Sequence, residues 1–205
     1  TNITAFMKKI TLLILLLLFS HTGFSQFAEN FEGAPAAPVA GGVWTLNSGD
    51  WQIFDNGVGS FNWRLNTAAF PAFSAPNAAL ILNQNIGAGN TSMDYLATPL
   101  IPLPANAQLR FQTRTTIGGN QGTIFEIRAA AAGSNPALAA SYTTLVATFS
   151  EDDLSVPSNI TSYIEKVVNL PASLGPNVHL AFVKIYTQVG DGLGGDRWLV
   201  DDVRV

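Results

Sequence analysis

Short runs rich in strand-forming residues recur along the chain, and in some of them apolar and polar residues alternate with a period of two, which is typical of strands. In the run AQLRFQTRTT (107–116), Leu109 and Phe111 alternate with Arg110 and Gln112. This alternation predicts a strand with one buried face. Similar short runs recur to the end of the chain and are separated by Gly, Pro, Asn and Ser. We expect strands near 27–32, 50–54, 78–83, 94–98, 107–116, 123–130, 142–149, 161–169, 177–187 and 196–205.

The run NVHLAFVKIYT (177–187) is apolar on both faces, which predicts a central strand that is covered on both sides. Turn residues lie between the runs, for example Gly118-Gly119-Asn120. No helical periodicity extends beyond two turns, and no internal repeat or linker is evident. Short strands joined by such turns predict an all-β fold, an antiparallel jelly-roll β-sandwich formed by a single domain over residues 26–205.

The first segment predicts an export signal. Lys8 and Lys9 precede the apolar run ITLLILLLLF, and small residues follow it. A basic start, a short apolar run and a small-residue cleavage site are typical of a secretory signal peptide. A membrane anchor needs about 20 apolar residues, more than this run offers. We therefore expect a signal peptide over 7–25, cleavage before Gln26, a start-site artefact over 1–6, and a secreted, extracellular protein.

Composition excludes several classes of function. The chain has no cysteine and only two histidines, which excludes a disulfide framework, thiol catalysis and a multi-histidine metal site. Charged residues make up only 12% of the chain, and the formal net charge is −4. Nucleic-acid binding needs clustered Lys and Arg, so we expect no nucleic-acid partner.

Two acidic residues interrupt apolar rows of the terminal strands. Strict alternation over 196–205 places Asp201 on a face with Leu199, Val203 and Val205. Over 27–32 it places Glu29 on a face with Phe27 and Phe31. Two nearby carboxylates repel unless one is protonated or a cation lies between them, and Ca²⁺ accepts carboxylate oxygens. A calcium ion joining the two strands is one hypothesis; arginine or backbone N–H partners are the other.

Four segments form an ordered set: ENFEG, GDWQIFDNG, YLATPLIPL and DRWLVDDVRV. Together they resemble the choice-of-anchor J and cleaved-adhesin type of domain, which is similar to the MAM-type jelly roll and occurs in secreted and surface proteins of Bacteroidetes-type bacteria. The resemblance covers nearly all of residues 26–205. It implies a jelly roll, a non-catalytic adhesion role, surface attachment through a segment beyond Val205, and calcium near the terminal acids. The ligands it implies are Glu29, Glu32, Asp201, Asp202 and, more weakly, Asp50.

The expected function is therefore a secreted or cell-surface adhesion or recognition module that is not an enzyme. Its expected partner is a protein or glycan of a host or matrix. Trp63, Phe70 and Phe73 lie in loop-like sequence, where aromatic side chains can contact a ligand, whereas Trp51 and Trp198 are expected in the core.

Two alternatives stay open. One is a carbohydrate-binding module of a larger secreted enzyme. The other is a glycoside hydrolase that uses an acid pair such as Glu126 and Glu165.

Overall fold

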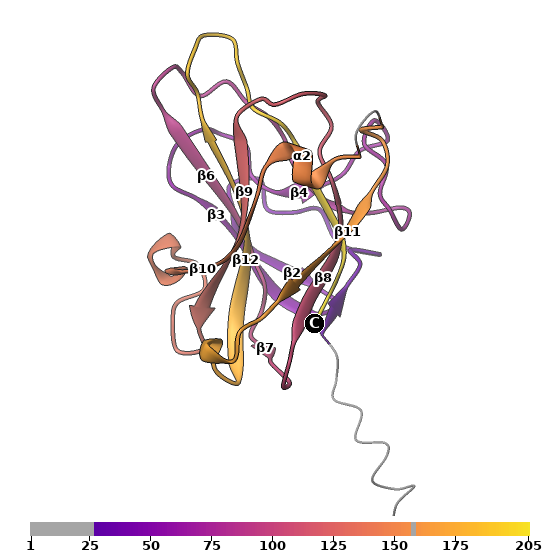
Figure 1. Ribbon diagram of the computed structural model, residues 1–205, viewed down its shortest axis with the longest axis vertical. Coiled ribbons are helices and arrows are strands. Elements are labelled where there is room, and N and C mark those ends of the chain that lie inside the picture. Colours follow the sequence, from indigo (N-terminus) through magenta and orange to yellow (C-terminus); the bar gives the residue numbers. More distant parts are fainter. Residues whose placement is uncertain (1–26, 157–158) are drawn as a thin grey trace, which may run out of the picture.

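The computed structural model describes residues 27–156 and 159–205, and the predicted signal peptide lies outside these ranges. Two antiparallel sheets pack face to face and form a β-sandwich (Figure 1). The predicted fold class is confirmed. Within the described ranges, we find no helix with the length and apolarity that a membrane crossing requires.

Sheet A has the strand order β11-β8-β13-β5-β4, with β1 paired to β13. Its strands, within the described residues, are β1 (Ala28–Glu29), β4 (Arg64–Leu65), β5 (Ala79–Ile81), β8 (Gln108–Arg114), β11 (Ile164–Asn169) and β13 (Trp198–Arg204). The first and last strands of the domain are therefore neighbours, as we expected.

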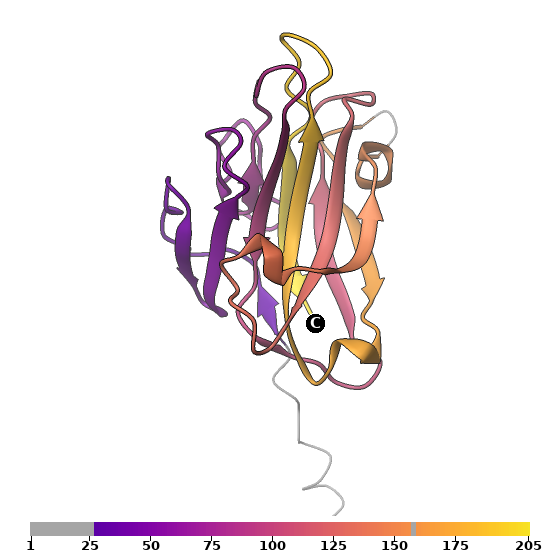
Figure 2. The same cartoon turned by 90° about the vertical axis from the view of Figure 1, so that its left-hand side faces the viewer.

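Sheet B has the order β10-β9-β12-β6-β3-β2, with β7 paired to β12. Its strands over the same described ranges are β2 (Gly42–Leu46), β3 (Gly49–Asp55), β6 (Thr91–Ala97), β7 (Ile101–Pro102), β9 (Thr123–Ala131), β10 (Thr144–Phe149) and β12 (Asn177–Thr187). Figure 2 looks onto this sheet, from indigo β2 to orange β10. The run 177–187 forms β12 between β9 and β6, which confirms its central position.

Each of the ten predicted strands has a counterpart in the structure. The sequence analysis missed β2, β4 and β7, of which two are only two residues long and β2 starts at a glycine. The helical elements are short: α2 (Glu151–Leu154), η1 (Ala139–Ser141) and η2 (Ala172–Leu174). Ser150 caps α2 because its hydroxyl accepts a hydrogen bond from the Asp153 N–H, and the Asp153 carboxylate accepts one from the Ser150 N–H.

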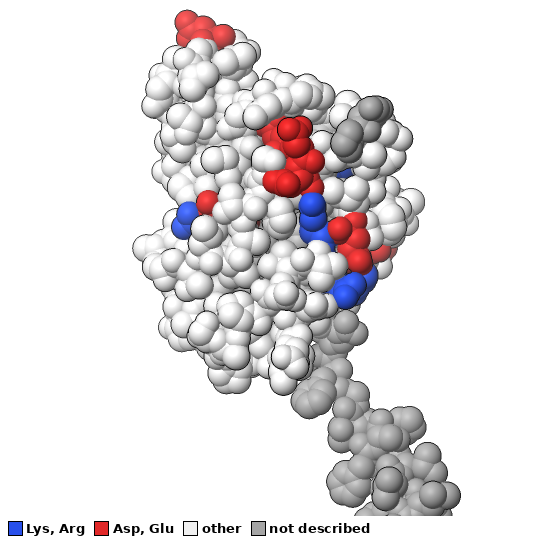
Figure 3. Space-filling model, in the orientation of Figure 1, with Lys and Arg blue, Asp and Glu red and all other residues white. Residues whose placement is uncertain are grey.

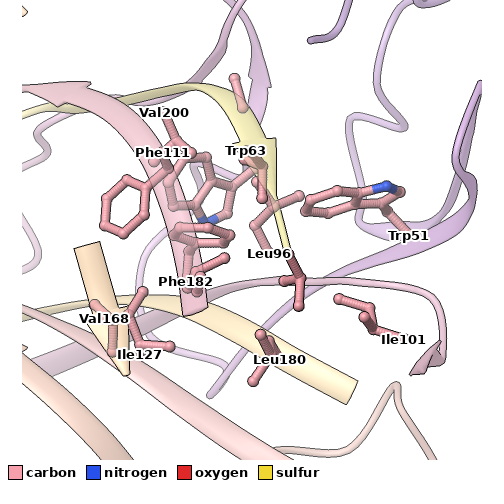
Figure 4. Close-up of a cluster of buried hydrophobic side chains, with 14 of the residues drawn as sticks. Trp51, Trp63, Leu96, Ile101, Phe111, Ile127, Val168, Leu180, Phe182 and Val200 are labelled. Carbon is pink, nitrogen blue, oxygen red and sulfur yellow. The ribbon is translucent and has the colours of Figure 1, made fainter. Parts of the chain in front are cut away.

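Aromatic side chains dominate the core between the sheets (Figure 4). The Trp198 ring lies 5.4 Å from Trp63, 4.9 Å from Phe125 and 5.7 Å from Phe182. The Trp198 indole N–H donates to the Thr113 hydroxyl at 2.7 Å, which satisfies its polar atom inside the core. Trp51 and Trp198 are both fully buried, as predicted.

The predicted face assignment of the last strand is wrong. Asp201 pairs with Gln112, and Arg204 pairs with Arg110. The chain therefore advances three residues in β13 while it advances only two in β8. This β-bulge is accompanied by a left-handed backbone at Asp202 (φ 46). The extra residue reverses the alternation, so Trp198 and Val200 before it and Val203 and Val205 after it all reach the core. Asp201 instead points away from the core, to the outer face of sheet A.

Candidate functional site

The loop over residues 66–78, which connects β4 to β5, crosses the outer face of sheet A. It carries Phe70 and Phe73, two of the predicted ligand-binding residues. Phe73 is 51% exposed although it is a large apolar side chain, and its ring lies edge-on to Tyr163 at 5.7 Å. Phe70 is half-buried, and the Arg197 guanidinium lies 5.0 Å from its ring centre. This loop therefore presents aromatic rings to solvent on a rigid sheet.

Asp201 holds this loop in place. Its side chain is fully buried, and its Oδ2 accepts hydrogen bonds from the N–H groups of Phe73 at 3.0 Å and Ser74 at 2.9 Å. Its Oδ1 accepts one from the Asp202 N–H at 2.8 Å. The Ser74 hydroxyl also bonds to the half-buried Asp202 at 2.8 Å. The aspartate pair thus fixes the segment that presents Phe73.

Burial raises the pKa of the Asp201 carboxyl to about 7, against the hydrogen bonds from Ser74, Asp202 and Phe73, which lower it. The carboxyl therefore exchanges its proton near neutral pH. Because it accepts from three backbone N–H groups, the hypothesis of backbone partners accounts for this residue without a cation.

Tyr163, Arg114 and Arg197 complete this region. The sequence analysis considered Arg197 only as a possible partner of the terminal acids and assigned none of the three residues to a binding surface. Tyr163 donates its hydroxyl to the Pro71 carbonyl at 3.0 Å, and burial raises its pKa to about 12. Arg114 lies 5.1 Å from the Tyr163 ring centre and donates to the Pro71 carbonyl at 3.3 Å. In the run 107–116, Arg114 continues the outward row of Arg110 and Gln112. Its partner in the 66–78 loop is distant in sequence and could not be predicted. We call Phe70, Phe73, Tyr163, Arg114 and Arg197 the aromatic–arginine surface.

The other predicted metal ligands are dispersed. Glu29 is buried, accepts from the Phe31 N–H at 2.7 Å, and accepts from the Ser48 N–H at 3.0 Å and hydroxyl at 2.7 Å. Glu32 accepts from the Asn77 N–H at 3.2 Å. Asp50 is exposed and accepts from the Thr45 hydroxyl at 2.7 Å.

Glu29 and Asp201 lie on opposite faces of sheet A, because Glu29 pairs with the core residue Val203. The expected meeting of these two carboxylates is therefore wrong. In the part of the chain that the structure describes, no three Asp, Glu or His side chains form a group suited to a metal ion. Glu29 and Asp202 do line one pocket of about 410 Å³ beside the paired strands β1 and β13. The calcium site remains a prediction.

Trp63 does not have the exposed position that we predicted. Its side chain is 1% exposed and lies among the buried apolar side chains of the core (Figure 4). Its ring packs on Trp198 at 5.4 Å. Its indole N–H donates to the Asp94 carbonyl at 3.3 Å. The sequence GVGSFNWRLN resembles a loop because of its glycines and asparagines, yet the tryptophan fills the core. It contributes only to the lining of a pocket of about 270 Å³ beside β4.

The acid pair considered for glycoside hydrolysis does not meet. Glu126 lies in β9 of sheet B, and Glu165 lies in β11 of sheet A. Their neighbours in sequence face the core, so both carboxylates point outward from opposite faces of the sandwich. Glu126 pairs with Arg128 at 2.5 Å, and Glu165 pairs with Arg110 at 3.3 Å. In a glycosidase the two carboxyl groups lie on either side of one glycosidic bond, about 5–9.5 Å from each other. Glu126 and Glu165 do not have this arrangement.

A second group of ionisable side chains lies inside the sandwich. Asp94 of β6 and Lys184 of β12 are directly paired, face inward, and are 1% and 0% exposed. The Lys184 ammonium donates to the Leu82 carbonyl at 2.9 Å, whereas neither Asp94 carboxylate oxygen has a hydrogen-bond partner in the described chain. Burial raises the pKa of Asp94 to about 7; Lys184 opposes this rise and Asp55 adds to it. Burial also lowers the pKa of Lys184, against the neighbouring acids.

No family model and no curated protein matches the sequence. The fold is similar to two cleaved adhesin domains of Lys-gingipain from Porphyromonas gingivalis W83. The K1 domain is 19% identical with a TM-score of 0.54, over 88% of this chain and 96% of that chain. The K3 domain is 17% identical with a TM-score of 0.57, over 88% and 98%. A structure of carbohydrate-binding modules from the β-sandwich superfamily is 12% identical with a TM-score of 0.51, over 86% and 60%. The chain therefore has an adhesin-like β-sandwich fold.

Proposed function

We propose that this domain is a non-catalytic, extracellular recognition module that binds carbohydrate on the aromatic–arginine surface. The observation that carries the proposal is Phe73, a large aromatic side chain that is half exposed although the backbone beside it is fixed by a buried carboxylate. An exposed ring on a rigid scaffold offers a flat apolar face at low entropic cost. The names of the similar structures, an adhesin domain and carbohydrate-binding modules, agree with this proposal.

A protein ligand is the second candidate, because the similar Lys-gingipain domains are named as adhesins. Identifying the ligand, carbohydrate or protein, distinguishes the two candidate functions. A glycan array with the domain over residues 26–205 tests carbohydrate directly, and an array without any bound glycan would contradict the proposal.

Replacing Phe73 with alanine is expected to weaken glycan binding at least tenfold, which is about 1.4 kcal/mol. The free energy of unfolding should change by less than about 1 kcal/mol, because much of this side chain is already in water. Calorimetric titration and chemical denaturation measure the two effects. Leu138→Ala is the matched control, since Leu138 is 53% exposed and lies elsewhere on the surface. Equal binding by the Phe73 variant and the control would contradict the role of this surface.

Calcium binding is a separate part of the proposal. The acids at the β1–β13 junction support it, in particular Glu29 and Asp202, which line the same pocket. Calcium that binds the native state is expected to raise the free energy of unfolding by about 2.7 kcal/mol at a hundredfold excess over its Kd. Thermal unfolding with calcium and then with excess chelator measures this, and Asp202→Asn should reduce the shift. Identical midpoints with calcium and chelator would exclude a structural calcium ion.

A further inference from the structure

Aromatic–arginine couples gather around the 66–78 loop. Of the four cation–π couples among the described residues, three lie on or beside the outer face of sheet A: Arg64 with Phe61 at 5.2 Å, Arg197 with Phe70 at 5.0 Å, and Arg114 with Tyr163 at 5.1 Å. Arg64 belongs to β4, where it pairs with Leu80, and Leu80 pairs in turn with Leu199 of β13. The three guanidinium groups are therefore held by one sheet and its covering loop.

These three arginines have no ion-pair partner among the residues that the structure describes. The ion pairs there are Arg110–Glu165, Arg204–Glu165 and Arg128–Glu126. On the face in Figure 3, the blue side chains likewise lie close to red ones. The chain has 14 acidic and 10 basic residues, so acidic residues outnumber basic ones. A shortage of acids therefore does not explain why these arginines lack a carboxylate partner.

The nearby aspartates do not neutralise the arginines. Asp201 is fully buried, and its oxygens accept from N–H groups of the loop and of β13. Asp196 is also buried, and one of its oxygens accepts from the N–H groups of Thr116, Ile117 and Arg197. The other Asp196 oxygen has no hydrogen-bond partner in the described chain. Within the described ranges, neither carboxylate forms an ion pair with Arg64, Arg114 or Arg197.

Each arginine has a distinct role. Arg114 is 3% exposed and uses both terminal nitrogens on the carbonyls of Ile160 and Pro71, so it positions the loop. Arg64 and Arg197 are half-buried, and each lies against an aromatic ring. A guanidinium that stacks on a ring keeps N–H groups at its edge, and such an edge matches the oxygens of a carboxylate or sulfate. One terminal nitrogen of Arg197 donates to the Thr116 hydroxyl at 3.1 Å, which leaves its remaining N–H groups for a ligand.

We infer that the ligand of the aromatic–arginine surface, extended by Arg64 of the nearby strand β4, is an anionic polysaccharide. In this complex a sugar ring contacts Phe73, and carboxylate or sulfate groups of the chain are bound by Arg197 and by Arg64. This inference rests on the proposed carbohydrate-binding function and specifies its ligand class. The charge on the ligand replaces the carboxylate partner that the two arginines lack within the described chain.

The test is calorimetric titration of the domain with three oligosaccharides of equal length: an oligogalacturonate, a sulfated galactan and a neutral galactan. At least one of the anionic ligands should bind ten times more tightly than the neutral one, and its affinity should fall as salt rises from 50 to 200 mM. Arg64→Gln and Arg197→Gln should each weaken anionic binding about tenfold. Lys166→Gln is the matched control, because Lys166 stacks on Phe149 at 5.5 Å in another region.

The outcomes separate this inference from the proposed function. If the neutral galactan binds as tightly as the anionic ligands, and Phe73→Ala but neither arginine variant weakens it, the anionic class is excluded and carbohydrate binding stands. If none of the three ligands binds and a glycan array is also empty, both are excluded. Preference for one anionic ligand identifies its group as the carboxylate or the sulfate.

Discussion

Replacing Lys184 with methionine is expected to lower the free energy of unfolding by about 3–5 kcal/mol at pH 8. Lys184 is fully buried, and Asp94, the residue paired with it, is 1% exposed. Methionine fills a similar volume but removes the cation, which leaves the Asp94 carboxylate beside Asp55 in a medium of low dielectric constant. An uncompensated buried charge is among the most destabilising changes in a protein core.

The loss should depend on pH in a defined direction. The pKa of Asp94 in the folded protein is about 7, above its ordinary value of 3.8, and the loss of Lys184 should raise it further. At pH values between 3.8 and the raised pKa of the folded protein, the folded state binds more protons than the unfolded state. The free energy of unfolding therefore falls as pH rises through this window. The Lys184→Met variant is therefore expected to be less destabilised at pH 5 than at pH 8. Urea unfolding at both values measures the difference.

The double variant Lys184→Met, Asp94→Leu provides the control. It removes both charges, so it should recover most of the lost stability and lose the added pH dependence. A single variant that loses less than about 1 kcal/mol at pH 8 would contradict the prediction. So would a double variant that is as unstable at pH 8 as the single one.

The sequence predicted the strands well because a half-buried strand imposes a local rule, the two-residue alternation. The rule failed at residues 201–204, where a bulge inserts one residue and reverses the faces. Strict alternation placed Asp201 in the same row as Val203, but the structure places the two on opposite sides of the sheet. Nothing in the local sequence indicates a bulge there, apart from the adjacent Asp201 and Asp202, since aspartate is uncommon in strands.

The partners of the site residues were beyond sequence reasoning because they are distant in the chain. Asp201 binds the backbone of Phe73 and Ser74, which lie 128 and 127 residues away. The loop-like sequence around Phe73 correctly indicated an exposed position, whereas the same criterion failed for Trp63, which is buried. The sequence around Lys184 could have indicated the buried pair. Lys184 lies in the same row as Phe182 in a strand that is apolar on both faces, so it faces the core and needs a buried acidic partner.

Replacing Asp201 with alanine is expected to lower the free energy of unfolding by about 3 kcal/mol at pH 7.5 and to abolish glycan binding. The variant removes the acceptor of three backbone N–H groups, those of Phe73, Ser74 and Asp202. Hydrogen bonds to a charged group contribute about 1.5–3 kcal/mol each, and buried donors without a partner add a further loss. Binding should fall although Asp201 is fully buried, because the carboxylate positions the exposed Phe73.

The neighbouring aspartate is the matched control. Asp202 is half-buried and accepts one side-chain hydrogen bond, from the Ser74 hydroxyl, so Asp202→Ala should cost about 1 kcal/mol or less when both variants are measured with excess chelator. Hydrogen exchange gives the decisive measurement, because the Phe73 and Ser74 amides should exchange much faster in Asp201→Ala than in Asp202→Ala. If both amides keep their wild-type protection in Asp201→Ala, the carboxylate does not hold the loop. The position of the Phe73 ring would then depend on its contact with Tyr163 and on the hydrogen bonds that Tyr163 and Arg114 donate to the Pro71 carbonyl.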